Sequence, residues 1–316
     1  MNDIFSPIEA LRFGWYTLKK NIIFFLVLMV IVAVLYAFSS MLVNVIVAAL
    51  YAFPYMIGMI FPHLYDNLSQ APISGLTIIL IIVVAIAAVA INITVEMGLL
   101  KIALSFRDNI MPEVTDLFRS YPLILNYLAA SIIYVLMVLG GFALLAAGNF
   151  FLGSGGGVGQ IILSLGLLLL AIYLALKYQF YGYLIVDKEM GPIEALLQSD
   201  RLTACALKPL LIFWLLLYGL MIIIYIVLSV LFALPIGILA FSEFKSLFAI
   251  FAAAIFKTAI DFISFTIKLL IIVPITKLST AYIYRALEEH HMSSASEEVE
   301  PEVEPEVEPE VDEMMD

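Results

Sequence analysis

The chain contains several strongly apolar runs without charge, each about 20 residues long or longer. The first run extends from Ile22 to Pro62 and contains no Asp, Glu, Lys or Arg. A helix needs about 20 mostly apolar residues to cross the hydrocarbon layer of a bilayer. Because that layer offers no partners to the backbone, a spanning segment must satisfy its own hydrogen bonds as a helix or in a closed barrel. The runs therefore predict a membrane protein made of helical spans.

The composition supports this prediction and excludes a soluble enzyme. Hydrophobic residues make up 64% of the 316 residues and charged residues 13%, whereas soluble domains are about 45–50% apolar and about 25% charged. The single cysteine excludes a disulfide-rich secreted module. The expected fold class is an all-α, polytopic transmembrane helical bundle.

Six runs have the length of a span, and together with their loops they form a membrane domain over residues 22–285. The spans lie near 22–46, 76–100, 123–147, 160–182, 210–234 and 250–276. The segment 44–62 is open to two interpretations, because the first uncharged run is long enough for two spans. Its aromatic residues, with Pro54 and Gly58, favour an interfacial segment over a seventh span.

The basic residues predict the orientation of these spans. With six spans, twelve Lys and Arg residues fall on the side of the two termini, and only Lys245 falls in a loop on the other side. Basic residues mark the cytoplasmic side. The sequence therefore predicts a multi-pass protein of the cell membrane with both termini in the cytoplasm. The twelve are Arg12, Lys19, Lys20, Lys101, Arg107, Arg119, Lys177, Lys188, Arg201, Lys208, Lys277 and Arg285.

The C-terminal segment 286–316 differs from the rest of the chain. From Glu288 onward it holds thirteen of the 26 acidic residues and no Lys or Arg, and it repeats Glu-Val-Glu-Pro from Glu298 to Pro309. Proline at every fourth residue and repulsion between like charges oppose a helix. We expect a disordered acidic tail, which either aids solubility or docks a basic protein partner. The negative charge argues against a nucleic-acid partner.

A short motif occurs twice and indicates an internal duplication. Ser-Pro-Ile-Glu-Ala-Leu at 6–11 recurs as Gly-Pro-Ile-Glu-Ala-Leu at 191–196. In each copy an N-cap residue precedes a proline at the first helical position, and a glutamate follows where the helix dipole favours it. With a serine N-cap, the glutamate can also close a capping box. The helix-start residues are Ser6, Pro7 and Glu9 in the first copy and Gly191, Pro192 and Glu194 in the second.

Each copy of the motif predicts a cytoplasmic helix that leads into a span. Residues 1–21 form an amphipathic entry helix, and residues 191–207 form a second one. In the first helix, apolar residues share one face and basic residues stand at the end, as in a helix that lies at the membrane interface. Both copies then cross the membrane and return, which makes them a parallel repeat. The expected apolar face consists of Ile4, Ile8, Leu11, Trp15 and Leu18.

The residues around the second copy resemble a known family. Tyr183-Leu-Ile-Val-Asp187, the motif at 191–196 and Ser199, followed by a hydrophobic span, are similar to a widespread, largely uncharacterised prokaryotic family of six-span membrane proteins. That family includes the membrane domain attached to some glycerophosphodiester phosphodiesterases. The resemblance covers about residues 5–285, but the specific match is confined to 178–200 and, more weakly, to 6–21.

Two short segments depart from this family pattern. Such relatives often carry an aromatic residue and a basic-glycine pair after the motif, where this chain has Asp-Arg-Leu-Thr at 200–203 and Lys-Pro at 208–209. The sequence also contains no phosphodiesterase catalytic domain. The resemblance therefore implies membrane architecture and not hydrolysis.

Charged residues within the predicted spans are the candidate functional residues, because ionisable groups are costly in hydrocarbon. The last span holds Lys257, Asp261 and Lys268, and offsets of four and eleven place them on one helical face. Lys257 and Asp261 are expected to pair near the outer interface. Lys268 lies near mid-bilayer and needs a counter-charge, for which Glu96 and Asp261 are the candidates. Pro274 predicts a kink in the same helix.

No residue set indicates a catalytic, cofactor or metal site. The glycine-rich segment 153–159 lacks the Lys-Ser or Lys-Thr of a phosphate-binding loop, so no cofactor is expected. Tyrosines at 173, 178, 181 and 183 are typical of an interfacial aromatic belt.

Three classes of function remain. The favoured one is a non-catalytic membrane module that organises lipids or a protein partner, the latter bound through the acidic tail or the amphipathic helices. The second is a small transporter or exporter that uses the charges within the spans. The third, a membrane enzyme, has the least support.

Overall fold

The computed structural model describes residues 4–60, 75–151, 158–241 and 247–297, and all regular elements in these ranges are helical. Six segments of the described chain are long and apolar enough to cross a membrane. This confirms the prediction of an all-α, multi-pass membrane protein with six spans. The segments are Ile22–Val45, Ile79–Arg107, Val114–Gly140, Ile161–Lys188, Leu207–Val230 and Lys257–Ser293.

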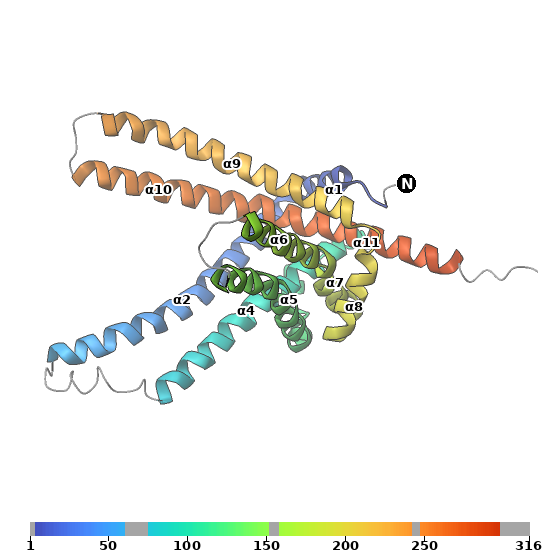
Figure 1. Cartoon of the computed structure of the whole chain (residues 1–316), viewed down its shortest axis with the longest axis horizontal. Coiled ribbons are helices and arrows are strands. Elements are labelled where there is room, and N and C mark those ends of the chain that lie inside the picture. Colours follow the sequence, from blue (N-terminus) through green and yellow to red (C-terminus); the bar gives the residue numbers. More distant parts are fainter. Residues whose placement is uncertain (1–3, 61–74, 152–157, 242–246, 298–316) are drawn as a thin grey trace, which may run out of the picture.

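The long helices are arranged as three antiparallel hairpins (Figure 1). In the first, α2 (Ile22–Ile60) packs on α4 (Gly75–Arg107). In the second, α5 (Ile124–Phe151) packs on α6 (Val158–Tyr178), and in the third α9 (Leu207–Phe241) packs on α10 (Leu247–Ile267). Figure 1 shows the first and third hairpins leaving a shared end of the molecule and diverging from each other.

We call that shared end the base. It contains the short helices α1 (Pro7–Lys20), α7 (Tyr181–Lys188) and α8 (Pro192–Thr203), together with the end of α4 and the helix α11 (Val273–Glu297). Two 3₁₀ turns, η1 (Val114–Phe118) and η2 (Tyr121–Leu123), lead from α4 into α5. Fully buried side chains concentrate here, among them Leu28, Met97, Ile102, Leu184, Phe213 and Tyr284.

Away from the base, the hairpins expose large apolar side chains. On α4 these include Ile79, Val83 and Ile86, and on α9 Ile222 and Ile226. In water such a surface would be unstable, but within a bilayer it faces lipid tails of the same polarity. The hairpins are therefore built for contact with lipid, and the base is the part that packs as a protein core.

Polar contacts add to the packing of the first hairpin. The Asn92 amide donates hydrogen bonds to Ser39 Oγ at 2.9 Å and to the Ala88 carbonyl at 2.7 Å, and Ser39 Oγ also donates to the Ala88 carbonyl. Hydrogen bonds between helices stabilise association where apolar contact gives no preference over lipid. They fix how α2 and α4 are rotated against each other.

The repeated motif begins α1 and α8 in the same way. Each helix has an extended N-cap residue, Ser6 or Gly191, and a proline at its first position. The expected capping box in the first copy is wrong, because Ser6 makes no side-chain cap hydrogen bond and Glu9 is exposed. Glu194 is exposed as well. The motif therefore acts through its proline and its backbone geometry.

The face of α1 that packs against the protein consists mainly of small residues, and part of the expected apolar face is exposed. The helix buries Ala10, Gly14 and Thr17 against α11, while Ile8 is 70% exposed and Trp15 48% exposed. Gly14 lies so close to α11 that a β-carbon there would collide with the Ser279 side chain. Small residues at a helix interface allow this approach. Tight contact between backbones selects the small-residue face over the more apolar one.

Three predicted boundaries change in the structure. α2 continues without a break to Ile60, so the described part of 44–62 prolongs the helix of the first span and is not a separate span. The second entry helix ends at Thr203 and not at residue 207. α11 continues to Glu297, so residues 286–297 belong to a helix and not to the tail. The Glu-Val-Glu-Pro repeat lies outside the described residues.

The last span contains a short π-helical turn. Between α10 and α11 lies η3 (Lys268–Ile272), in which the Val273 amide donates to the Lys268 carbonyl. Pro274 follows directly, and its ring would clash with the carbonyl four residues earlier in a regular α-helix. The wider turn accommodates this proline, where the sequence predicted a kink. It also changes the face on which the residues after Pro274 lie.

Substitution of Gly98 tests the close packing of the base. A β-carbon at Gly98 would overlap the backbone of Leu117 in η1, so Gly98→Ala should lower the free energy of unfolding by about 1–3 kcal/mol. Gly219→Ala is the control, because a β-carbon there meets nothing within 4 Å and alanine favours a helix. Thermal unfolding in detergent measures both. Equal midpoints for the two variants would contradict the described contact.

Candidate functional site

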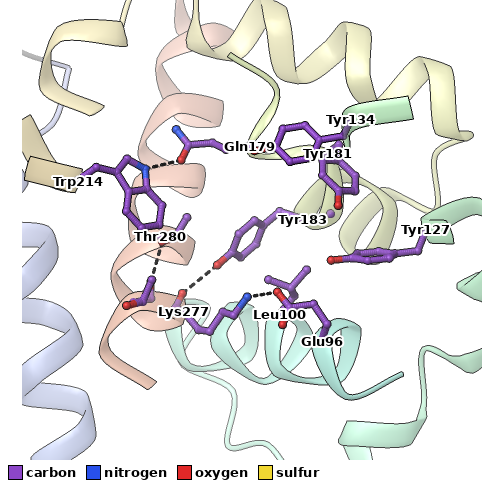
Figure 2. Close-up of a pocket in the computed structure, with 12 residues that line it drawn as sticks. Glu96, Leu100, Tyr127, Tyr134, Gln179, Tyr181, Tyr183, Trp214, Lys277 and Thr280 are labelled. Carbon is purple, nitrogen blue, oxygen red and sulfur yellow. Dashed lines mark hydrogen bonds and ion pairs between the residues drawn. The ribbon is translucent and has the colours of Figure 1, made fainter. Parts of the chain in front are cut away.

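A pocket of about 230 Å³ lies where the three hairpins converge. α4 and α11 form one side of it, and α5, α7 and the start of α9 form the rest (Figure 2). The lining residues are Glu96, Leu100, Tyr127, Tyr134, Gln179, Tyr181, Gly182, Tyr183, Trp214, Thr276, Lys277 and Thr280. Every hairpin thus contributes to the pocket.

An ion pair between Glu96 and Lys277 lies on one side of this pocket. The Lys277 ammonium donates to Glu96 Oε1, and the pair links α4 to α11 (Figure 2). The two side chains are 34% and 22% exposed. Glu96 was predicted as a counter-charge for Lys268, and this pairing is wrong, because Glu96 pairs with Lys277. Lys277 lies nine residues after Lys268, and helical periodicity places the two on different faces.

The other predicted charges lie outside the pocket. Lys257 and Asp261 form an exposed i,i+4 ion pair at 3.0 Å, as the sequence indicated. Lys268 is exposed and makes no ion pair with a described residue. The alternative Lys268–Asp261 pair is therefore not formed either. Of the four predicted residues, Glu96 alone lines this pocket.

Four tyrosines line the pocket, and two of them correct the predicted aromatic belt. Tyr183 is 3% exposed and its hydroxyl donates to the Lys277 carbonyl at 3.0 Å. The Tyr181 hydroxyl lies 2.9 Å from Ser131 Oγ, and its ring is 5.6 Å from that of Tyr127 and 5.3 Å from that of Tyr134. Tyr181 and Tyr183 therefore face inward and do not lie at the lipid interface.

The break in the helix between α6 and α7 positions these side chains. The chain leaves α6 at Tyr178 and enters α7 at Tyr181. Ser199 Oγ of α8 accepts a hydrogen bond from the Phe180 amide at 3.1 Å and donates one to the Lys177 carbonyl at 3.0 Å. Thr203 Oγ1 donates to the same carbonyl at 2.9 Å. α8 thus satisfies the free backbone groups of the break, which stabilises the turn that carries Gln179 and Tyr181.

Trp214 of α9 closes another side of the pocket. Its indole nitrogen donates to Gln179 Oε1 at 2.7 Å (Figure 2). Because this hydrogen bond fixes the oxygen side of the amide, the Nε2 side is fixed as well. Gln179 Nε2 is buried and has no hydrogen-bond partner among the described residues. Such a donor is rare in folded proteins and marks a place where a ligand or water oxygen is expected.

A network of charges centred on Arg285 lies below the pocket at the base. The Arg285 guanidinium pairs with Asp108 at 2.7 Å, with Asp187 at 2.6 Å and with Glu288 at 2.8 Å. Tyr284 donates to Asp187 at 2.9 Å, and its ring stacks on Tyr183 with centroids 5.5 Å apart. The network therefore ties α4, α7 and α11 together directly beneath the pocket.

Sequence reasoning missed most residues of the site. Lys277 and Arg285 were counted as basic residues that set orientation, and Asp187 and Ser199 entered as parts of a family motif. Trp214 and Gln179 were not singled out. A second signal was present, since Lys277 and Arg285 lie two helical turns apart on α11 and both need counter-charges if that helix is packed.

The comparisons add no further assignment. No family model, no curated protein and no solved structure matches the chain. Within the described ranges, no group of three or more His, Cys, Asp or Glu side chains is placed to hold a metal ion. The functional argument therefore rests on the geometry of the pocket.

Arg285→Met tests the network. It leaves Asp187 and Glu288 partly buried without their guanidinium, which should lower the free energy of unfolding by about 2 kcal/mol. Lys257→Met is the control, because Lys257 and Asp261 are both exposed in their ion pair and an exposed pair contributes little to stability. Thermal unfolding of both variants in the same detergent gives the answer. If Lys257→Met were as damaging as Arg285→Met, the network would not be the contact that holds the base.

Proposed function

We propose that this chain is a non-catalytic integral membrane protein that holds a membrane lipid or a similar amphiphile in the pocket between its three hairpins. One observation carries the proposal: a pocket with a charged pair and several polar groups lies at the point where long, apolar, exposed hairpins meet. An amphiphile likewise combines a polar part with an apolar part, namely its head and its chains. The pocket suits the head, and the hairpin surfaces suit the chains.

The proposed membrane and the orientation of the protein in it are based on the distribution of basic residues. The twelve Lys and Arg residues predicted to be cytoplasmic lie on the short helices of the base, in the turns near it and at the adjoining helix ends. The pattern supports a cell-membrane protein with the base and both termini on the cytoplasmic side. On α1, exposed Trp15 and Ile8 beside Lys19 support a position at the lipid interface.

Two further elements of the proposal rest on the sequence. Membership of the six-span family with phosphodiesterase-linked members is supported by the motif whose Ser199 holds the α6–α7 break. An internal duplication is supported by the shared environment of the two copies, since Ala10 and Ala195 are both fully buried and Ile8 and Ile193 are both exposed. A protein partner bound through the tail or the amphipathic helices stays a second possibility for the same module.

A small transporter is the alternative function. The observation in its favour is the Glu96–Lys277 pair, which couples two hairpins through a contact that a bound solute or ion could break. Charges of this kind mark solute and ion pathways in membrane proteins. A transporter would move a solute across a liposome bilayer and would lose this flux when the pair is neutralised, whereas a lipid-holding module would show no flux.

The proposed function predicts a lipid that leaves the membrane together with the protein. The protein extracted in native lipid discs should carry one lipid class enriched over the bulk membrane. Glu96→Gln combined with Lys277→Met should reduce this enrichment by about tenfold, because charge-assisted contacts contribute about 1.5–3 kcal/mol each. Mass spectrometry of the disc lipids and of co-purifying proteins measures both binding partners.

The matched control neutralises a pair outside the pocket. Lys257→Met combined with Asp261→Asn removes the same charges from an exposed position on α10 and should leave the enrichment unchanged. Bulk lipid composition around the unmodified protein would contradict lipid binding in the pocket. A stoichiometric protein partner without an enriched lipid would assign the module to protein organisation.

A further inference from the structure

The charge balance of the pocket restricts what it can bind. Among its lining residues, Glu96 and Lys277 are the charged ones, and they carry opposite charges on different helices. A ligand of one sign would satisfy one member and leave the other unpaired in a medium of low dielectric constant, which is strongly unfavourable. A zwitterion replaces the single ion pair by two. The pair therefore favours a ligand with one positive and one negative group close together.

The aromatic residues specify the positive group. Tyr127, Tyr134, Tyr181, Tyr183 and Trp214 surround the pocket from α5, α7 and α9 (Figure 2). Aromatic rings attract ammonium groups through their π-electrons, and clusters of them bind alkylated ammonium ligands. With Glu96 beside them, these rings form a site suited to an organic ammonium.

The remaining donors suit the negative group. Lys277 supplies an ammonium, whereas the hydroxyls of Thr276 and Thr280 already donate to carbonyls of their own helix. The buried Gln179 Nε2, which has no partner among the described residues, offers a further donor to a ligand oxygen. Lysine and neutral amide donors are groups that bind phosphate oxygens.

The pocket is too small to enclose a whole lipid. Its volume of about 230 Å³ is below the roughly 300–1,000 Å³ of pockets that enclose a drug-sized ligand. Trp214 stacks on Tyr218 one turn further along α9, and Tyr218 is 58% exposed. The pocket wall at Trp214 is therefore continuous with the exposed surface of the third hairpin.

We propose that the pocket binds the zwitterionic headgroup of a phospholipid, with the phosphate at Lys277 and the ammonium between Glu96 and the aromatic rings. The acyl chains lie along the apolar hairpins. This inference rests on the proposed function and names the lipid class that the site selects. The same chemistry is found in a free aminoalkyl phosphate, so the test separates the two sources.

Trp214 provides a direct reporter for this test. The chain has two tryptophans, so a Trp15→Phe background leaves Trp214 as the one indole, and it lies in the pocket wall. Purified protein in a non-ionic detergent is titrated with dihexanoylphosphatidylethanolamine, dihexanoylphosphatidylglycerol or glycerophosphoethanolamine while Trp214 emission is recorded. The zwitterionic lipid should give a saturable change, with the anionic lipid and the free headgroup each at least about tenfold weaker.

Variants identify the groups responsible. Glu96→Gln and Lys277→Met should each weaken binding of the zwitterionic lipid by about tenfold or more. Each single variant leaves its partner without a counter-charge and could fail to fold, so the double variant is measured as well. It retains no unpaired charge and should show the same loss. Lys257→Met with Asp261→Asn, outside the pocket, should bind as the unmodified protein does.

The outcomes separate this inference from the proposed function. If both lipids bind equally well, headgroup selection is overturned and lipid binding stands. If glycerophosphoethanolamine binds as tightly as the lipid, the ligand is a soluble zwitterion and the lipid assignment is overturned. If neither lipid nor free headgroup changes Trp214 emission, the inference and the proposed function fail together. Selective, saturable binding that the pocket variants lose supports both.

Discussion

The ion pairs of Arg285 hold together the end of the molecule on which everything else depends. One guanidinium contacts Asp108 at the end of the first hairpin, Asp187 of α7, which follows the second, and Glu288 on its own helix, which continues the third. Elsewhere the hairpins expose apolar side chains, and lipid tails compete equally well for such surfaces. Polar contacts at the base therefore fix an arrangement that apolar contacts alone would leave open.

Close backbone packing adds a second constraint at the base. Gly14 lets α1 approach α11, and Gly98 lets α4 approach η1. Ser199 and Thr203 of α8 take up the backbone groups left free between α6 and α7. These contacts place small or hydroxylated residues where larger side chains would separate the helices. Together they hold the walls of the pocket at a fixed distance, so the pocket is a product of packing at the base.

The pocket combines features that an apolar membrane core disfavours. A glutamate, a lysine, two threonines, a glutamine and several hydroxyls line a single space. Desolvating these groups is costly unless they are paired, and pairing is nearly complete: Lys277 with Glu96, Tyr183 with the Lys277 carbonyl, and Trp214 with Gln179. The pocket keeps its polarity at this energetic cost, which is the physical reason to assign it a ligand.

The sequence by itself determined the helical class, the six spans and the choice of Glu96 as a charge to be paired within the spans, because hydropathy and the cost of burying a charge are local properties of the chain. The tertiary structure decided which residue pairs with it. Lys277 is 181 residues from Glu96, and the packing of α11 on α4 brings the two side chains together. In the same way, the apolar stripe of α1 was visible in the sequence, but the small-residue face packs, because close contact with α11 requires it. The helical state of residues 286–297 was also beyond local reasoning, since Glu288 and Glu289 pair with Lys188 and Arg107 of other helices and so belong to the packed base.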